Sequence, residues 1–102
     1  MEVTLAPLTA IPEGEGRTFD VGKTRLAVFR SRQGEVFATQ AECPHRGGVL
    51  ADGLLGGCTL ICPLHALKFD LRSGRALNGD CSVKTYPTRL GSNGQILVEL
   101  GE

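Results

Sequence analysis

Two short segments, each combining one cysteine with one histidine, constrain this chain more than any other feature. The first reads Cys43-Pro44-His45-Arg46-Gly47-Gly48, and the second reads Cys62-Pro63-Leu64-His65. Sixteen residues separate His45 from Cys62, and the sequence holds no third histidine. Two thiolates and two imidazoles complete a four-ligand set for a metal. We therefore expect Cys43, His45, Cys62 and His65 to share one metal site.

The mixed composition of each segment bears on which metal is bound. Structural zinc accepts two cysteines and two histidines, but the usual zinc finger groups a cysteine pair before a histidine pair. A Rieske [2Fe–2S] centre has one iron held by two cysteines and the other by two histidines. Mixed segments suit that centre, because each segment then reaches both irons. Proline after each cysteine stiffens the loop, and a structural zinc-binding module stays open as the alternative.

The two motifs, C-P-H-R-G-G and then C-P-L-H at this spacing, resemble those of the Rieske family. The resemblance implies one [2Fe–2S] cluster per chain, bound by Cys43, His45, Cys62 and His65. It also implies a small antiparallel fold in which a loop-rich cluster-binding subdomain is inserted into a scaffold of sheets. That subdomain is expected at about residues 42–76.

The length of 102 residues predicts one domain covering residues 1–102. The formal net charge is zero, so no basic field is available to attract nucleic acid or an anionic membrane. The N-terminus lacks the pattern of a signal peptide, and no apolar stretch approaches the length of a membrane span. From these features we expect a soluble, cytoplasmic protein that binds neither nucleic acid nor membrane.

Four cysteines in such a chain are expected to be ligands or buried thiols rather than disulfides. Beyond the two in the motifs, Cys58 begins the apolar run of residues 58–61, which predicts a small core residue. Cys81 lies in the loop of residues 78–82, where partial exposure is expected. The sequence assigns no function to either residue.

The rest of the sequence predicts an all-β domain, because short alternating apolar runs bounded by turn residues dominate and no long helical period occurs. In the clearest run, residues 24–30, Leu26 and Val28 face one way and Ala27 and Phe29 the other. The strands are expected at residues 3–8, 17–21, 24–30, 35–39, 60–62, 67–71, 82–90 and 96–100.

Glycine and proline mark where these strands turn. Gln33-Gly34 and Asn93-Gly94 predict hairpin turns. Pro87, inside the run of residues 82–90, predicts an edge position or a bulge.

Two positions separate the chain from the respiratory branch of the Rieske family. Members of that branch carry an extra cysteine three residues after the first histidine and another just before the second, whereas this chain has Gly48 and Leu64 there. The chain therefore resembles the ferredoxin-like branch.

Within that branch we favour the small electron-transfer subunit of an assimilatory NAD(P)H nitrite reductase, which residues 68–77 and 82–87 resemble most. Many such subunits lack the four ligands, so a stand-alone Rieske ferredoxin of an aromatic-ring oxygenase stays as the alternative. Both readings imply a one-electron carrier. Its donor would be an NAD(P)H-dependent flavoprotein reductase, and its acceptor a terminal reductase or oxygenase.

No independent catalytic site is expected, although the chain belongs to an oxidoreductase system in either reading. The catalytic subunit of a Rieske oxygenase needs a second iron, typically held by two histidines and a carboxylate. Both histidines here are already assigned to the cluster. Gly14-Glu15-Gly16 lacks the third glycine and the helix of a dinucleotide-binding loop.

The resemblance also implies a low reduction potential. High-potential members place a serine two residues, and a tyrosine four residues, after the second histidine, and their hydroxyl groups donate to sulfur. Here those positions are Leu67 and Phe69, so we expect a midpoint on the order of −150 mV.

The residues around the ligands indicate how a partner would dock. Arg46 and Lys68 are expected either to stabilise the reduced cluster and guide docking or to be ordinary solvated cations. Pro44, Leu64 and Ala66 are expected to form an apolar rim for the partner.

Overall fold

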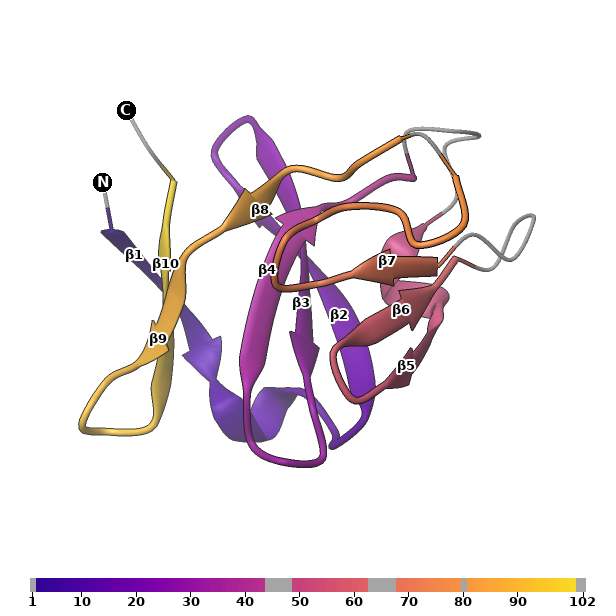
Figure 1. Cartoon of the computed structure of the whole chain (residues 1–102). Helices are drawn as coiled ribbons and strands as arrows, with labels where there is room; N and C mark the ends of the chain where they lie inside the picture. Colours follow the sequence, from indigo (N-terminus) through magenta and orange to yellow (C-terminus); the bar gives the residue numbers. More distant parts are fainter. Residues whose placement is uncertain (1, 44–48, 63–67, 80, 101–102) are drawn as a thin grey trace.

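The computed structural model describes residues 2–43, 49–62, 68–79 and 81–100 (Figure 1). In these ranges the chain forms three antiparallel sheets, with short 3₁₀ turns at η1 (Leu8–Ala10) and η2 (Leu50–Asp52) and no α-helix. The expectation of an all-β fold is confirmed.

The three sheets lie side by side across Figure 1. On the left is the first sheet, in the order β1 (Glu2–Pro7), β10 (Gln95–Glu99), β9 (Thr88–Leu90). The central sheet has the order β2 (Glu15–Val21), β3 (Thr24–Arg30), β4 (Val36–Gln40), β8 (Thr85–Tyr86). On the right is the third sheet, β5 (Leu54–Gly56), β6 (Thr59–Ile61), β7 (Lys68–Asp70). Because β4 pairs with β8, the third sheet is an insertion between two neighbouring strands of the central sheet.

Strand β3 is buried on both faces and separates two hydrophobic cores. Leu26 and Val28 pack with Ile96 and Val98 in the core between the first and central sheets. Ala27 and Phe29 point the other way, into the core shared with the third sheet. The predicted division of this strand into two apolar faces is confirmed, and one face of β3 therefore forms part of the core that the inserted segment packs on.

Strand β2 begins at Glu15, two residues before its predicted start, because Gly16 belongs to the sheet rather than to the preceding turn. Gly16 pairs with Phe29. A β-carbon at residue 16 would lie 2.5 Å from Cδ1 and 2.6 Å from Cε1 of the Phe29 ring. Glycine here leaves the room that a large buried ring needs on the neighbouring strand.

The single strand predicted at residues 82–90 is wrong. The structure divides it at Pro87 into β8, which pairs with β4, and β9, which pairs with β10. Proline has no N–H group to donate to a ladder, so it suits the point where the chain leaves one sheet for another.

The remaining boundaries agree with the prediction to within one or two residues, apart from β5, which the sequence analysis missed. Strand β5 has only three residues and carries the exposed Leu54, so it shows no clear alternation. The two predicted hairpin turns are confirmed, with Gly34 and Gly94 at φ of 90° and 80°.

Candidate metal centre

Cys43 and Cys62 occupy equivalent places, each directly after a residue that is paired with another strand or segment. Glu42 forms an antiparallel bridge with Val49, and Ile61 pairs with Lys68 across β6 and β7. Each pair closes the base of a six-residue segment, residues 43–48 in the first case and 62–67 in the second. In both motifs, therefore, the cysteine follows directly after an antiparallel pair, and that pair fixes where the backbone enters the ligand segment.

Both cysteines are buried in the same core. Cys43 is 3% exposed and Cys62 is 2% exposed. They belong to the cluster that also contains Leu50, Leu60, Phe69, Leu71, Val83, Ala27 and Phe29. All four cysteines lie within the described residues, and none of them is in a disulfide. Two thiols brought into one apolar core are the sulfur donors that an iron–sulfur cluster requires, so the described half of the donor set fits such a cluster.

The other predicted site residues lie outside the described residues. These are the two histidine ligands, the cation beside the first of them, the three rim residues and the first of the two hydroxyl positions: His45, His65, Arg46, Pro44, Leu64, Ala66 and Leu67. The structure thus brings together Cys43 and Cys62 of the predicted set. It also places Phe69, the second hydroxyl position, fully buried in the same core.

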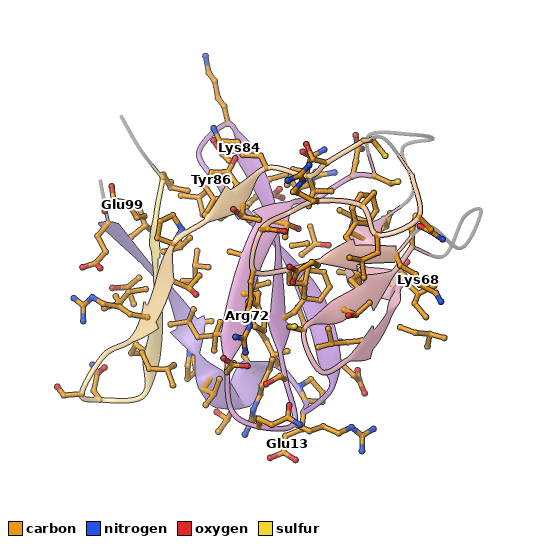
Figure 2. All side chains as sticks on the ribbon, viewed as in Figure 1. Glu13, Lys68, Arg72, Lys84, Tyr86 and Glu99 are labelled. Carbon is orange, nitrogen blue, oxygen red and sulfur yellow. The ribbon has the colours of Figure 1, made fainter. Side chains whose placement is uncertain are left out.

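Two apolar side chains are exposed at the bases of the two segments. Val49, which pairs with Glu42, is 45% exposed. Leu77, whose N–H donates to the carbonyl of Lys68 at 2.7 Å, is 60% exposed. The exposed Lys68 is the first residue of β7 and lies at the right of Figure 2. An exposed apolar side chain therefore lies beside the base of each ligand segment, and an exposed cation lies at the base of the second.

The two additional cysteines are in different surroundings. Cys58 was predicted as a core residue, and this prediction is wrong: it is half-buried in the turn between β5 and β6, where its carbonyl accepts a 2.8 Å hydrogen bond from the N–H of Leu71. The apolar run that suggested burial starts one residue later, at Thr59 in β6. Cys81 is half-buried and packs against the core that holds Cys43 and Cys62.

One charged contact ties the inserted segment to the central sheet. Arg72, just after β7, donates from Nη2 to both carboxylate oxygens of Glu35 at 3.0 Å. Glu35 lies in the turn between β3 and β4. The hydrogen bond to Glu35 raises the pKa of Arg72 above its usual range. Because both side chains are exposed to water, the pair orients the segment more than it stabilises the fold.

Two further residues hold the ends of the second ligand segment in place, and neither was predicted from the sequence. Gly53 leaves no room for a β-carbon, which would overlap the carbonyl oxygen of Ile61, the residue before Cys62. Asn78 accepts the N–H of Lys68 on its side-chain oxygen at 2.9 Å. In the sequence, Gly53 indicated only a turn between two apolar runs. Asn78 carried no signal, because asparagine is common in loops.

Comparison with known proteins supplies the family. The model of the Rieske [2Fe–2S] domain matches residues 1–87, a span that includes both cysteine–histidine segments. The ferredoxin component of the naphthalene 1,2-dioxygenase system of Pseudomonas aeruginosa is 35% identical over 95 residues, which is 91% of this chain and 89% of the relative.

The chain belongs to the Rieske [2Fe–2S] family.

Solved structures show the same fold at full length. The Sphingomonas yanoikuyae B1 ferredoxin has a TM-score of 0.86 at 29% identity, covering 99% of this Rieske chain and all of its own. A structure described as the small subunit of an NADH-dependent nitrite reductase from Mycobacterium tuberculosis has a TM-score of 0.91 at 24% identity, covering 100% and 97%. At that identity the second likeness concerns the fold alone.

The Rieske chain is accordingly a ferredoxin-type electron carrier that contains one [2Fe–2S] cluster. The structure agrees with the predicted architecture, a small scaffold of antiparallel sheets with a loop-rich insertion. None of the helical turns in the described ranges has the length and hydropathy needed to cross a bilayer.

Proposed function

We propose that Cys43, His45, Cys62 and His65 ligate the cluster, with the two thiolates on one iron and the two imidazoles on the other. The observation that carries this proposal is the burial of Cys43 and Cys62 in one core, each at the start of a segment closed by an antiparallel pair. Each segment contributes one residue of each type, so each would supply one ligand to either iron. When bound, the cluster supplies a site that gains and loses one electron.

The apolar residues around this site limit the access of water to the metal ligands. The apolar core around Cys43 and Cys62 excludes water from the thiolate side. A change of charge on the cluster is therefore weakly screened by solvent, and nearby cations and N–H donors have a larger effect on the potential than they would in water.

The electron donor we propose is an NAD(P)H-dependent flavoprotein reductase, and the acceptor is the terminal component of an aromatic-ring oxygenase. The support is the 35% identity, over nine-tenths of the chain, to the ferredoxin component of a dioxygenase system. Retention of all four ligands in the sequence fits this assignment.

A second acceptor, the large subunit of an assimilatory nitrite reductase, is supported by a different observation. Residues 68–77 and 82–87 resemble those of nitrite reductase small subunits. The structure described as a nitrite reductase small subunit shares the fold and does not decide between the two acceptors. Both systems are therefore tested in the same experiment.

The deciding experiment is electron transfer with purified partners. The chain is mixed with NADH and a ferredoxin reductase, and then with either an aromatic-ring oxygenase or the large nitrite reductase subunit. We expect NADH oxidation to depend on the chain and on the reductase, and product to form with one acceptor. NADH oxidation by the chain alone would contradict the absence of a catalytic site, and transfer to neither acceptor would overturn both assignments.

The partner surface we propose is the apolar rim of Pro44, Leu64 and Ala66. The exposed Val49 and Leu77 support it, because each adds an exposed apolar side chain beside a residue that borders one of the two segments. The nearby exposed Lys68 favours an acidic contact on the partner.

We further propose that residues 1–102 form one domain, with the cluster-binding subdomain at about residues 42–76. The insertion of β5–β7 between β4 and β8 supports these limits. A cytoplasmic location is part of the same proposal, and the observation that supports it is that none of the four cysteines is in a disulfide.

A further inference from the structure

The side chain of Gln40 connects the peptide that precedes Cys43 to a segment more than forty residues later. Its Nε2 donates to the carbonyl oxygen of Glu42 at 2.8 Å. Its Oε1 accepts the backbone N–H of Lys84, also at 2.8 Å. The backbone N–H of Gln40 returns a bond to the carbonyl of Lys84 at 2.9 Å. Both ends of the amide are therefore satisfied, and both partners are main-chain groups.

The bond to Glu42 acts on the orientation of Cys43. The carbonyl of Glu42 and the N–H of Cys43 belong to one planar peptide group, which is trans. In a trans peptide these two groups point in opposite directions. By holding the carbonyl, Gln40 fixes where the N–H of Cys43 points and the direction in which the chain enters the ligand segment.

The bond to Lys84 anchors the amide itself. Lys84 follows Val83, which is buried in the core that contains Cys43 and Cys62. The N–H of Val83 donates to the carbonyl of Gly74 at 2.7 Å, so this segment is held from its other side as well. The side chain of Lys84 lies over the ring of Tyr86, with Nζ 5.1 Å from the ring centroid, so its contribution to Gln40 comes from the backbone alone.

We propose that Gln40 is a positioning residue for the cluster: its side-chain amide holds the peptide that leads into Cys43 and ties it to the buried segment around Val83. This inference rests on the proposed role of Cys43 as a ligand. Gln40 does not itself contact the metal. It acts by limiting the conformations of the ligand segment, which makes loss of the cluster slower and its electronic structure uniform.

Two variants separate the two hydrogen bonds of the amide. Gln40→Met has similar length and no charge, and it removes both bonds. Gln40→Glu keeps an acceptor for Lys84 but turns a carboxylate oxygen toward the carbonyl of Glu42, where an N–H₂ group was. The matched controls are Gln33→Met and Gln33→Glu, because Gln33 is exposed in the turn between β3 and β4.

The experiment measures the rate of cluster loss to a chelator and the EPR spectrum of the reduced protein. Loss of both hydrogen bonds predicts release at least roughly fivefold faster for Gln40→Met, with broadened or shifted g-values. Gln40→Glu should release faster still, because two oxygens then face each other. Both Gln33 variants should behave like the parent protein.

A Gln40→Met protein with the parent's release rate and EPR spectrum would overturn the inference. So would a faster release with an unchanged spectrum, since that is the result of a purely structural role. If Gln40→Met does not fold, Gln40→Glu decides on the same two readouts. A parent protein that carries zinc in place of the cluster would overturn the proposed function, whereas equal release rates and spectra in cluster-loaded parent and variant would overturn this inference alone.

Discussion

Gly53 packs directly against the carbonyl group of Ile61, the residue that precedes Cys62. A β-carbon at residue 53 would overlap that oxygen and would also lie 3.0 Å from Cδ1 of Leu60. The backbone of Gly53 is ordinary, with φ of −74°, so the need for glycine here comes from space and not from conformation. The end of η2 and the end of β6 can approach this closely only without a side chain between them.

Gly53→Ala should therefore displace the strand that leads into Cys62. A shift of backbone in a packed region costs about 1–3 kcal/mol, and we expect a lower free energy of unfolding together with a reduced content of iron and sulfide. Gly56→Ala is the matched control in the same segment, because nothing lies within 4 Å of a β-carbon there. Equal cluster content in the two variants would show that Gly53 does not position the ligand strand.

The cysteines outside the two motifs should be dispensable. Cys81→Ser and Cys58→Ser should both retain the cluster, since both residues are half-buried and neither belongs to the predicted ligand set. His65→Ala should lose the cluster or change its type. Absorption spectra and iron content of the three purified variants check this. A colourless Cys81→Ser protein would mean that the ligand set is wrong.

The reduction potential depends on a buried phenylalanine. Phe69 is 0% exposed and shares its core with both cysteines, so no hydroxyl group is available there to donate to sulfur. We expect a midpoint on the order of −150 mV and a rise in Phe69→Tyr, because a new O–H donor would stabilise the reduced cluster. Voltammetry measures both. A parent midpoint above roughly +100 mV would contradict the argument from missing donors.

An ion pair at the far end of the molecule gives a pH test of the fold. Arg89 in β9 donates to both carboxylate oxygens of Glu2 in β1, at 2.8 Å and 2.9 Å, so the pair joins the two outer strands of the first sheet. The hydrogen bond from Arg89 lowers the pKa of Glu2 below its usual value. Because the folded pKa is the lower one, the pair stabilises the fold fully above about pH 4.3, the ordinary value for glutamate. The contribution disappears as the pH falls through the pKa of the folded state.

Arg89→Met should accordingly lower the urea midpoint slightly at pH 7 and leave it unchanged at strongly acidic pH. The effect is small because both side chains are exposed. Arg17→Met is a suitable control, since its partner Glu15 lies on the same strand. A deficit for Arg89→Met that persists at acidic pH would show that the arginine acts through packing instead of charge.

Much of the fold was predictable because β3 and β10 are regular. The alternation in residues 24–30 and 96–100 predicts which side chains enter the two cores. Asn93-Gly94 predicts the hairpin between β9 and β10. Pro87 was recognised as unusual, but its role as a crossing between two sheets depends on strand partners far away in the sequence. Local patterns carry no information about such partners.

The ligands of the candidate site could be predicted from the sequence, but the residues that position those ligands could not. Cysteine and histidine are rare in this chain, so their spacing alone predicts a metal site and its ligands. Gly53, Gln40 and Asn78 act through hydrogen bonds and close contacts to main-chain groups of other segments. A glycine, a glutamine and an asparagine in such positions look like ordinary strand ends and loops until the chain is folded.

EPR of the reduced protein, combined with iron and sulfide analysis after anaerobic purification, tests the central claim most directly. The account predicts about two irons and two acid-labile sulfides per chain, with the low average g-value expected when histidines ligate one iron of the cluster. A colourless protein carrying one zinc ion and no sulfide would contradict it.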